Sequence, residues 1–356
     1  MTEPRSTPIW IRPTLSLTPF LTEGLASGQP PRRLDSALFD VDGVLIDTRR
    51  SYRLAVMHGS ERLVRVANGL TQAPSPMVAQ RDIAAFKLAG GFNSDWDATQ
   101  LFAALWTARL REWRGQPEAS VTVDDWAARA SDAARAGVGG VTWLRATFPA
   151  TAIPNDETAR WAHDEFYWGA TLVRELYGHE PVFAPEAEGF VHNEELLLGA
   201  ELLPTLRDLG IARFGLITGR VGPEVDWALR RLAGSCGLSE GAPPAGAPWY
   251  DDPHGRSPFA CVVPATLYAK PDPRALAHAV RRLEASAALY VGDTADDLDL
   301  VLRYRREEQA DDPMLPPVLA VAIARGAEAE VYRERGADIV LTHVNMLPEA
   351  LSRLDG

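Results

Sequence analysis

The sequence predicts an α/β protein whose parallel sheet is covered on both faces and is interrupted early by a long helical insertion. Two observations carry this prediction. After residue 195, short apolar segments alternate with helical segments, which is typical of a parallel sheet flanked by helices. Between about residues 50 and 193, the sequence instead has helical periodicity, many tryptophans and few runs of β-branched residues.

The first strand is predicted at residues 37–39, a short apolar run that stops at the charged residue Asp40. The residues before it, 1–34, are rich in Pro, Ser and Thr and are predicted to form an N-terminal arm outside the core. The α/β core domain is therefore assigned to residues 35–50 and 194–356. The helical domain is assigned to residues 51–193.

The later strands are predicted from further short apolar runs, at residues 214–217, 259–263, 287–291, 318–323 and 339–341. In an open parallel sheet, ligands bind beyond the carboxyl ends of the strands. The polar residues that follow these runs are therefore the first candidates for chemistry.

Composition and charge exclude several classes of function. The net charge of -12 argues against a nucleic-acid partner, which needs a basic face. The two cysteines, Cys236 and Cys261, have no metal-ligand spacing, so we expect no disulfide framework and a cytoplasmic location. The sequence starts without a secretory signal and contains no run of 18 apolar residues, so we expect no membrane partner.

Carboxylates, a hydroxyl and an ammonium group follow the predicted strand ends. They belong to Asp40, Asp42, Thr218, Lys270, Asp293 and Asp297. Converging carboxylates repel one another, and a hard divalent cation relieves that repulsion. Magnesium suits such a site because it binds a few carboxylates, keeps waters and accepts a phosphate oxygen. The lysine and the hydroxyl could then bind the remaining phosphate oxygens.

Each of these motifs alone has an ordinary explanation. Residues 40–43 could form a turn, although a calcium loop is excluded because Val44 and Leu45 stand where that loop needs an acid and a glycine. Thr218 could cap a helix and Lys270 could be a solvated surface lysine. The acids after Asp293 could charge the first turn of a helix: Asp296, Asp297 and Asp299. Four motifs in order, each at a strand end, favour the functional explanation.

Together these motifs resemble the haloacid dehalogenase superfamily, whose members are mostly phosphatases. The family's four motifs match residues 39–45 (D-x-D-G after a strand), 216–220 (Thr after a strand), 270–273 (Lys before Pro-Asp-Pro) and 292–297 (G-D-x-x-x-D). The insertion lies between the first and second motifs, as in subfamily IA with its helical cap. The resemblance implies a Rossmann-like three-layer α/β core with an inserted all-helical cap domain.

The resemblance also implies a role for each residue. Asp40 would be the nucleophile that forms an aspartyl-phosphate, and Asp42 would be the acid and base. Thr218 would donate to the phosphoryl oxygens, and Lys270 would neutralise charge between the phosphate and Asp40. Magnesium would be held by Asp40, the backbone carbonyl of Asp42 and Asp293, with Asp297 nearby through a water. Substrate binding is assigned to Gly43, Gly219 and Arg220.

Residues 86–97 also resemble one phosphatase-like branch of the same subfamily. The glycine pair at 90–91 could mark a loop that enters the pocket and selects the substrate. Lys87, Asn93 and Trp96 are assigned to substrate binding on that basis. The alternative is an ordinary turn between helices, with Phe92 and Trp96 in the core of the cap.

The resemblance thus predicts a magnesium-dependent phosphatase that hydrolyses a small organic phosphate monoester through an aspartyl-phosphate. Its partner would be a small phosphorylated metabolite, and the chain would be a monomer or a homodimer. A phosphomutase or other phosphotransferase of the same fold stays open, as does a non-catalytic phosphate-ligand-binding protein, although the intact set of six motif residues argues against the binder. A dehalogenase is disfavoured because its chemistry does not need the acid at Asp42 or the metal site.

Overall fold

A computed structural model describes residues 8–22, 32–71, 76–92, 94–235 and 257–354 of the 356-residue chain. The chain forms two compact units, here called the sheet unit (residues 1–47 and 195–356) and the helical unit (residues 48–194). The predicted divisions were at 50–51 and 193–194. Within the described ranges, none of the helices has both the length and the apolar character needed to cross a membrane.

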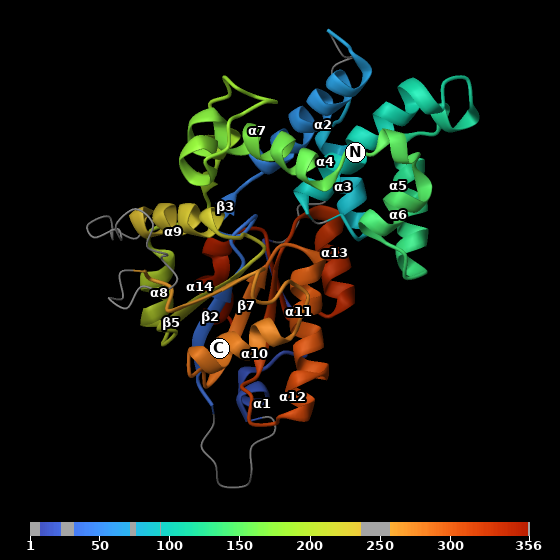
Figure 1. Cartoon of the computed structure of the whole chain (residues 1–356). Coiled ribbons are helices and arrows are strands. Elements are labelled where there is room, and N and C mark those ends of the chain that lie inside the picture. The colour runs from blue at the N-terminus through green and yellow to red at the C-terminus, as the bar shows by residue number, and fades with distance from the viewer. Residues whose placement is uncertain (1–7, 23–31, 72–75, 93, 236–256, 355–356) are drawn as a thin grey trace. The chain divides into compact units, whose positions relative to one another are not determined.

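The sheet unit is built on a sheet that contains, in the described residues, seven strands in the order β1-β9-β8-β7-β2-β5-β6 (Figure 1). Neighbouring strands pair in parallel, except that β1 pairs with β9 in antiparallel orientation. The strands are β1 (Ile9–Ile11), β2 (Leu34–Phe39), β5 (Arg213–Thr218), β6 (Cys261–Pro264), β7 (Ala287–Gly292), β8 (Val318–Ile323) and β9 (Ile339–Leu341). A separate antiparallel pair, β3 (Ile46–Asp47) and β4 (Glu195–Leu196), lies where the chain leaves and re-enters the sheet unit.

Helices cover both faces of the sheet. Successive residues of a strand point to opposite sides, and here both sides carry apolar side chains that pack against helices. In β2, Ala37 and Phe39 belong to one hydrophobic core, whereas Leu38 belongs to the other. The first core includes residues of α8 (Leu202–Asp208), α9 (Pro223–Ser235) and α14 (Leu347–Ser352); the second includes residues of α10 (Arg274–Arg282), α11 (Ala295–Arg306) and α13 (Gly326–Arg335). The predicted three-layer, Rossmann-like core is thereby confirmed (Figure 1). The short helices α1 (Leu17–Thr22) and α12 (Glu308–Asp311) and the 3₁₀ turn Val344–Met346 complete the unit.

The N-terminal residues differ from the prediction. Ile9–Ile11 add a strand to the edge of the sheet, and Ile9 is only 4% exposed within the first core. Arg12 lies 2.9 Å from the fully buried carboxylate of Asp338. The prediction that residues 1–34 lie outside the core is therefore wrong for this strand. Its three residues are too few to show a strand pattern within a Pro- and Thr-rich segment.

The helical unit has a core of its own. Its helices are α2 (Tyr52–Asn68), α3 (Gln80–Ala89), α4 (Asp95–Thr107), α5 (Val123–Arg135), α6 (Gly140–Thr147) and α7 (Asp156–Tyr177), with a π-helical turn at Ala108–Glu112 and 3₁₀ turns at Pro117–Ser120, Ala150–Ala152 and Phe190–Asn193. α2 and α4 pack against each other and against α7, and α3 packs against α5. Aromatic rings fill the core, among them Phe86, Phe92, Phe102, Trp126 and Trp143. The tryptophans that marked this segment in the sequence therefore serve largely as packing.

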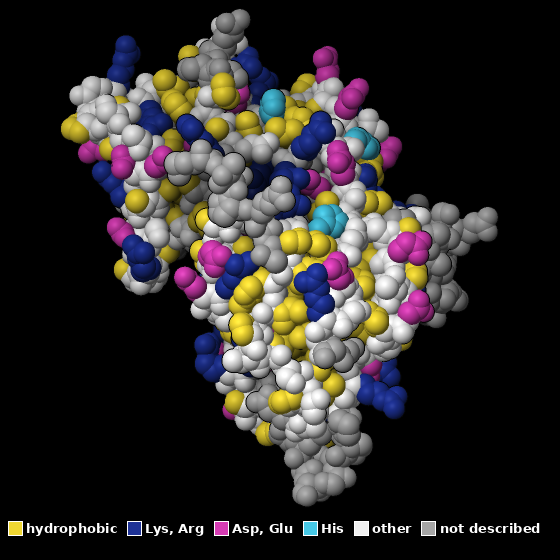
Figure 2. All heavy atoms as spheres, turned by 180° about the vertical axis from the view of Figure 1, so that it is seen from behind, with side chains coloured by type: hydrophobic (Ala, Val, Ile, Leu, Met, Phe, Trp, Pro, Cys, Tyr) yellow, Lys and Arg dark blue, Asp and Glu magenta, His cyan; other side chains and the backbone are white. Residues whose placement is uncertain are grey.

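Charged side chains of both signs are mixed over the face of the molecule drawn in Figure 2. The net charge of the whole chain is -12. An anionic ligand would therefore depend on local positive groups rather than on the field of the whole protein.

Candidate active site

The candidate active site lies at the carboxyl end of β2, where the strand order reverses. β5 and β6 extend to one side of β2, and β7, β8 and β9 extend to the other. This switch point is where open α/β sheets bind ligands. Asp40 follows β2, Thr218 ends β5, and Asp293 follows β7. The sheet topology thus brings the first, second and fourth motifs to one edge.

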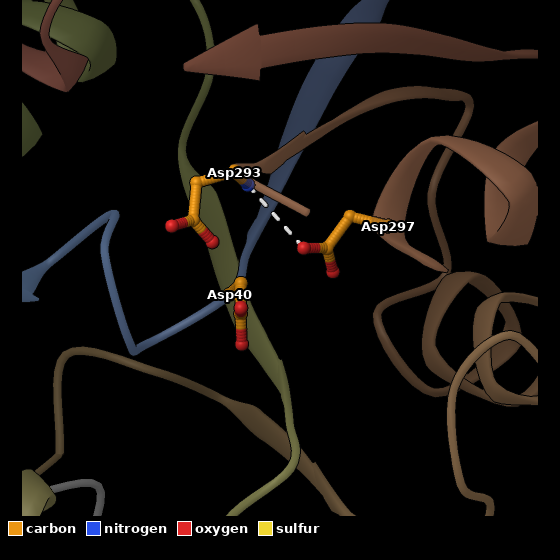
Figure 3. A group of neighbouring side chains, drawn as sticks. All are labelled: Asp40, Asp293 and Asp297. Atoms are coloured by element: carbon orange, nitrogen blue, oxygen red, sulfur yellow. Dashed lines mark hydrogen bonds between the residues drawn. The ribbon is translucent and has the colours of Figure 1, made fainter. Parts of the chain in front are cut away.

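Three carboxylates converge at this edge. One oxygen from each of Asp40, Asp293 and Asp297 lies within 4.8 Å of the others. Figure 3 shows that they come from the ends of β2 and β7 and from the first turn of α11, with the amide of Asp293 donating to Asp297 at 3.3 Å. Positions 40 and 293 are therefore close enough to share a cation.

The side chain of Asp40 is buried, and its pKa is raised. Its Oδ1 accepts from the amide of Val41 at 2.8 Å and lies 2.8 Å from Nζ of Lys270. Burial raises the pKa of Asp40 to about 7; Lys270 opposes this rise, and Asp297 and Asp42 add to it. Both contacts are made by Oδ1, and no described residue forms a hydrogen bond or ion pair with Oδ2.

Asp293 has the same need for a positive partner. Its pKa is raised well above the ordinary value by burial and by the charges of Asp40 and Asp297. Its Oδ1 is buried and has no hydrogen-bond partner within the described part of the chain. Two carboxyls with raised pKa values and one buried oxygen without a partner fit a divalent cation, because the ion would supply the missing positive charge and ligand contacts.

Asp297 is held differently, since donors already occupy both of its oxygens. Oδ1 accepts from Nζ of Lys270 at 2.8 Å and from the hydroxyl of Tyr290 at 2.6 Å. Oδ2 accepts from the hydroxyl and amide of Thr294, at 2.6 and 3.0 Å, in a capping box that begins α11. Burial alone would raise the pKa of Asp297, but Lys270 and these hydrogen bonds outweigh it, so the pKa is lowered. Asp297 therefore anchors Lys270 beside Asp40.

Gly43 leaves room for the carboxylate of Asp293. Its φ is +75°, and a Cβ at this position would lie 1.9 Å from Oδ2 of Asp293. Its amide donates to the carbonyl of Ile46 at 2.8 Å. The contribution of Gly43 to substrate binding stays a prediction. Gly219 has open space beside it, with nothing within 4 Å of the place a Cβ would take.

Arg220 contacts Asp42 instead of facing an open pocket. Its side chain is 1% exposed, and its Nε and Nη2 donate to Oδ1 of Asp42 at 3.0 and 2.8 Å. Direct binding of the substrate by Arg220 stays a prediction. The two residues are 178 positions apart, and nothing in the sequence around Arg220 indicates which carboxylate it meets.

Thr218 accepts a hydrogen bond from the amide of Arg220 at 3.1 Å through its Oγ1. Its hydroxyl proton is therefore left to donate to another group. Tyr290, which bonds Asp297, was missed by sequence reasoning because a tyrosine inside an apolar strand looks like an ordinary core residue.

Two of the predicted substrate-selecting residues, Lys87 and Trp96, lie on α3 and α4 of the helical unit. Nζ of Lys87 lies 3.0 Å from Oδ1 of Asp95. Trp96 donates from Nε1 to Asp164 at 2.7 Å, and it lines a pocket of about 460 Å³ within this unit. Asn93 lies outside the described residues. Phe92 is fully buried in the aromatic core, as the ordinary-turn alternative expected. Substrate selection by Lys87 and Trp96 stays a prediction.

Comparisons with known proteins identify the family and the fold. A model of the haloacid dehalogenase-like hydrolases matches residues 34–300. The solved structure of phosphatase Tt82 from Thermococcus thioreducens has a TM-score of 0.56 and 21% identity, over 90% of this chain and 99% of that one. A Northeast Structural Genomics Consortium target has a TM-score of 0.52 and 16% identity, over 90% and 99% of the two chains. At these identities the two structures show a shared fold. No curated protein matches the sequence.

Proposed function

Because the chain belongs to the haloacid dehalogenase-like hydrolase family, we propose that it is a phosphatase that hydrolyses a small organic phosphate monoester through a phosphorylated Asp40. The observation that carries the proposal is the cluster of Asp40, Asp293 and Asp297, with the ammonium of Lys270 2.8 Å from Asp40. A carboxylate nucleophile beside a cation site and a lysine supplies what phosphoryl transfer needs, which is positioning and compensation of negative charge.

Magnesium is the cofactor that we propose for the cluster. Its ligands would be Asp40, Asp293 and the backbone carbonyl of Asp42, with Asp297 contributing through a water. The cluster consists of carboxylates, and hard oxygen ligands suit magnesium better than a softer transition metal. When bound, the ion would neutralise the acids and polarise the phosphoryl group.

In the first half-reaction, an oxygen of Asp40 attacks phosphorus while the bond between phosphorus and the leaving oxygen breaks. The leaving oxygen takes a proton from the carboxyl group of Asp42, which yields the free alcohol. Lys270, fixed by Asp297, compensates charge on the phosphoryl oxygens. The hydroxyl of Thr218 donates to the same oxygens.

In the second half-reaction, a water molecule attacks phosphorus and gives a proton to the carboxylate of Asp42. The bond between phosphorus and Asp40 breaks, which restores the nucleophile and releases inorganic phosphate. The net reaction converts ester and water into alcohol and phosphate. If a sugar hydroxyl took the place of water, the outcome would be a phosphomutase.

A panel of small phosphate esters with magnesium tests the proposal. We expect the parent protein to release inorganic phosphate from at least one ester, and the Asp40→Asn variant to release none while its melting temperature shows that it is folded. Hydrolysis by Asp40→Asn at the parent rate would refute the proposal. A phosphorylated sugar product in place of inorganic phosphate would identify a mutase.

A further inference from the structure

The guanidinium of Arg220 forms an asymmetric contact with Asp42. Nε and Nη2 both donate to the same oxygen, Oδ1. The other oxygen, Oδ2, receives neither bond. The side chain of Arg220 is 1% exposed, whereas that of Asp42 is 29% exposed. Arg220 therefore binds Oδ1 of Asp42, and Oδ2 of Asp42 is left for a different partner.

Arg220 is itself fixed by the turn between β5 and α9. Its amide donates to Oγ1 of Thr218 at 3.1 Å, and its Nη1 lies 3.4 Å from the carbonyl oxygen of Glu224. The side chain of Glu224 accepts from the amide of Val221 at 3.2 Å, which closes the same turn. The second motif thus places a hydroxyl and a guanidinium from one hydrogen-bonded turn, and the guanidinium reaches the residue that we assign as acid and base.

A purely structural ion pair is the ordinary alternative. Buried ion pairs are weak evidence for stability, because desolvation offsets much of their attraction. This pair, however, falls on the one carboxyl group that must aim an oxygen at the leaving group. An aspartate side chain has several rotamers, and a fork of two N–H groups on Oδ1 selects among them.

We propose that Arg220 is a positioning residue that holds Asp42 through Oδ1, so that Oδ2 gives the proton to the leaving oxygen and later takes one from water. Oδ1 can accept both N–H bonds as the carbonyl oxygen of the protonated acid and as an oxygen of the carboxylate. The hold therefore persists through both half-reactions. This inference rests on the proposed function.

The test compares two esters that differ in their need for an acid. Nitrophenolate leaves readily without a proton, whereas an alkoxide does not. The value of kcat/KM covers the steps up to departure of the leaving group. We expect Arg220→Gln to lower kcat/KM about 100-fold for an alkyl phosphate and about 10-fold or less for p-nitrophenyl phosphate, because general acid catalysis contributes roughly 10²-fold or more. Arg220→Lys, which keeps the charge without the fork, should give a smaller loss with the same preference.

Two controls separate this role from folding and from phosphate binding. Arg305→Gln breaks another ion pair of the sheet unit, with the fully buried Asp338, and should lower the melting temperature without changing the ratio of kcat/KM for the two esters. In an Asp42→Asn background, Arg220→Gln should add less than about threefold, since the group that it positions is already disabled.

Equal losses on both esters in Arg220→Gln and Arg220→Lys would overturn the inference, because they would mean phosphoryl binding or a structural role alone. Additive losses in the Asp42→Asn background would overturn it as well. If the parent hydrolysed none of the esters, the proposed function would fail first, and this inference would fail with it.

Discussion

At the scale of single residues, Asp40 and Asp293 have opposing requirements. Burial and mutual repulsion favour their protonated forms, as the raised pKa values show. A nucleophile has to be ionised. Lys270 supplies one positive charge, and Asp297 already shares it. A divalent cation is the simplest group that lets both acids ionise together.

Magnesium should raise the melting temperature of the protein more at about pH 8 than at about pH 5.5. In the metal-free protein, the pKa of Asp40 is about 7, against an ordinary value of 3.8. A carboxyl group whose pKa is higher in the folded protein than in the unfolded chain stabilises the folded state. This stabilisation is complete at pH values below the pKa in the unfolded chain, and it is lost as the pH rises through the pKa in the folded protein. Bound magnesium should remove this loss, since it competes with the proton.

Thermal melting in chelator and in magnesium, at both pH values, measures this effect. The Asp293→Asn variant is the control, because it removes one ligand and should reduce the magnesium response. A magnesium response of the same size at both pH values would contradict the assignment of Asp40 to the cation site.

Gly43→Ala should abolish magnesium binding and lower activity by about 100-fold or more, since a Cβ would lie 1.9 Å from Oδ2 of Asp293 and would displace that ligand. Gly210→Ala is the matched control. Its φ is +88°, with nothing within 4 Å of the new Cβ, so it should cost about 1–2 kcal/mol of stability and leave magnesium affinity unchanged. Calorimetric titration with magnesium distinguishes the two. Equal affinities in Gly43→Ala and the parent would contradict the account.

At the scale of secondary-structure elements, the strands were the most predictable part. The run at 318–323 matches β8, and the run at 214–217 falls inside β5. Buried parallel strands are continuous apolar runs, and glycine or charge ends them. The edge strand β1 was missed because three residues carry too little pattern. Its place in the sheet comes from pairing with β9, at the other end of the chain.

Only those residues of the candidate site that lie at strand ends could be predicted from the sequence. Asp40, Thr218 and Asp293 follow or end strands, so topology alone gathers them. The pairing of Arg220 with Asp42 and the hydrogen bond from Tyr290 to Asp297 depend on side-chain directions. Neither contact leaves a periodic signal in the sequence.

On the helical unit, changes at Lys87 or Trp96 should alter which esters are used more than they alter the hydrolysis of p-nitrophenyl phosphate. Lys87→Ala releases Asp95, and Trp96→Phe removes the hydrogen bond to Asp164. Leu88→Ala is the control, because Leu88 is 81% exposed on α3, the helix that carries Lys87. This variant should change neither the preference among esters nor the hydrolysis of p-nitrophenyl phosphate. Relative rates over the ester panel measure the effect. A uniform loss over all esters would count against a selecting segment.

At the scale of the whole molecule, the proposed chemistry and the proposed selection lie on different units. The residues of the four motifs belong to the sheet unit, whereas Lys87 and Trp96 belong to the helical unit. The family predicted from those motifs is confirmed by the match over residues 34–300. In a chain of net charge -12, a phosphate ester would depend on Lys270 and a bound cation for its positive partners.

The central claim is that Asp40 carries the phosphoryl group. The Asp42→Asn variant should hydrolyse the phosphorylated intermediate slowly. p-Nitrophenyl phosphate should still phosphorylate this variant, because the nitrophenolate leaving group needs little acid assistance. After an acid quench, mass spectrometry of peptides should find the added phosphoryl group on Asp40, and it should find none in the Asp40→Asn variant. Phosphate release with no phosphorylated Asp40 in any quenched sample would contradict the account.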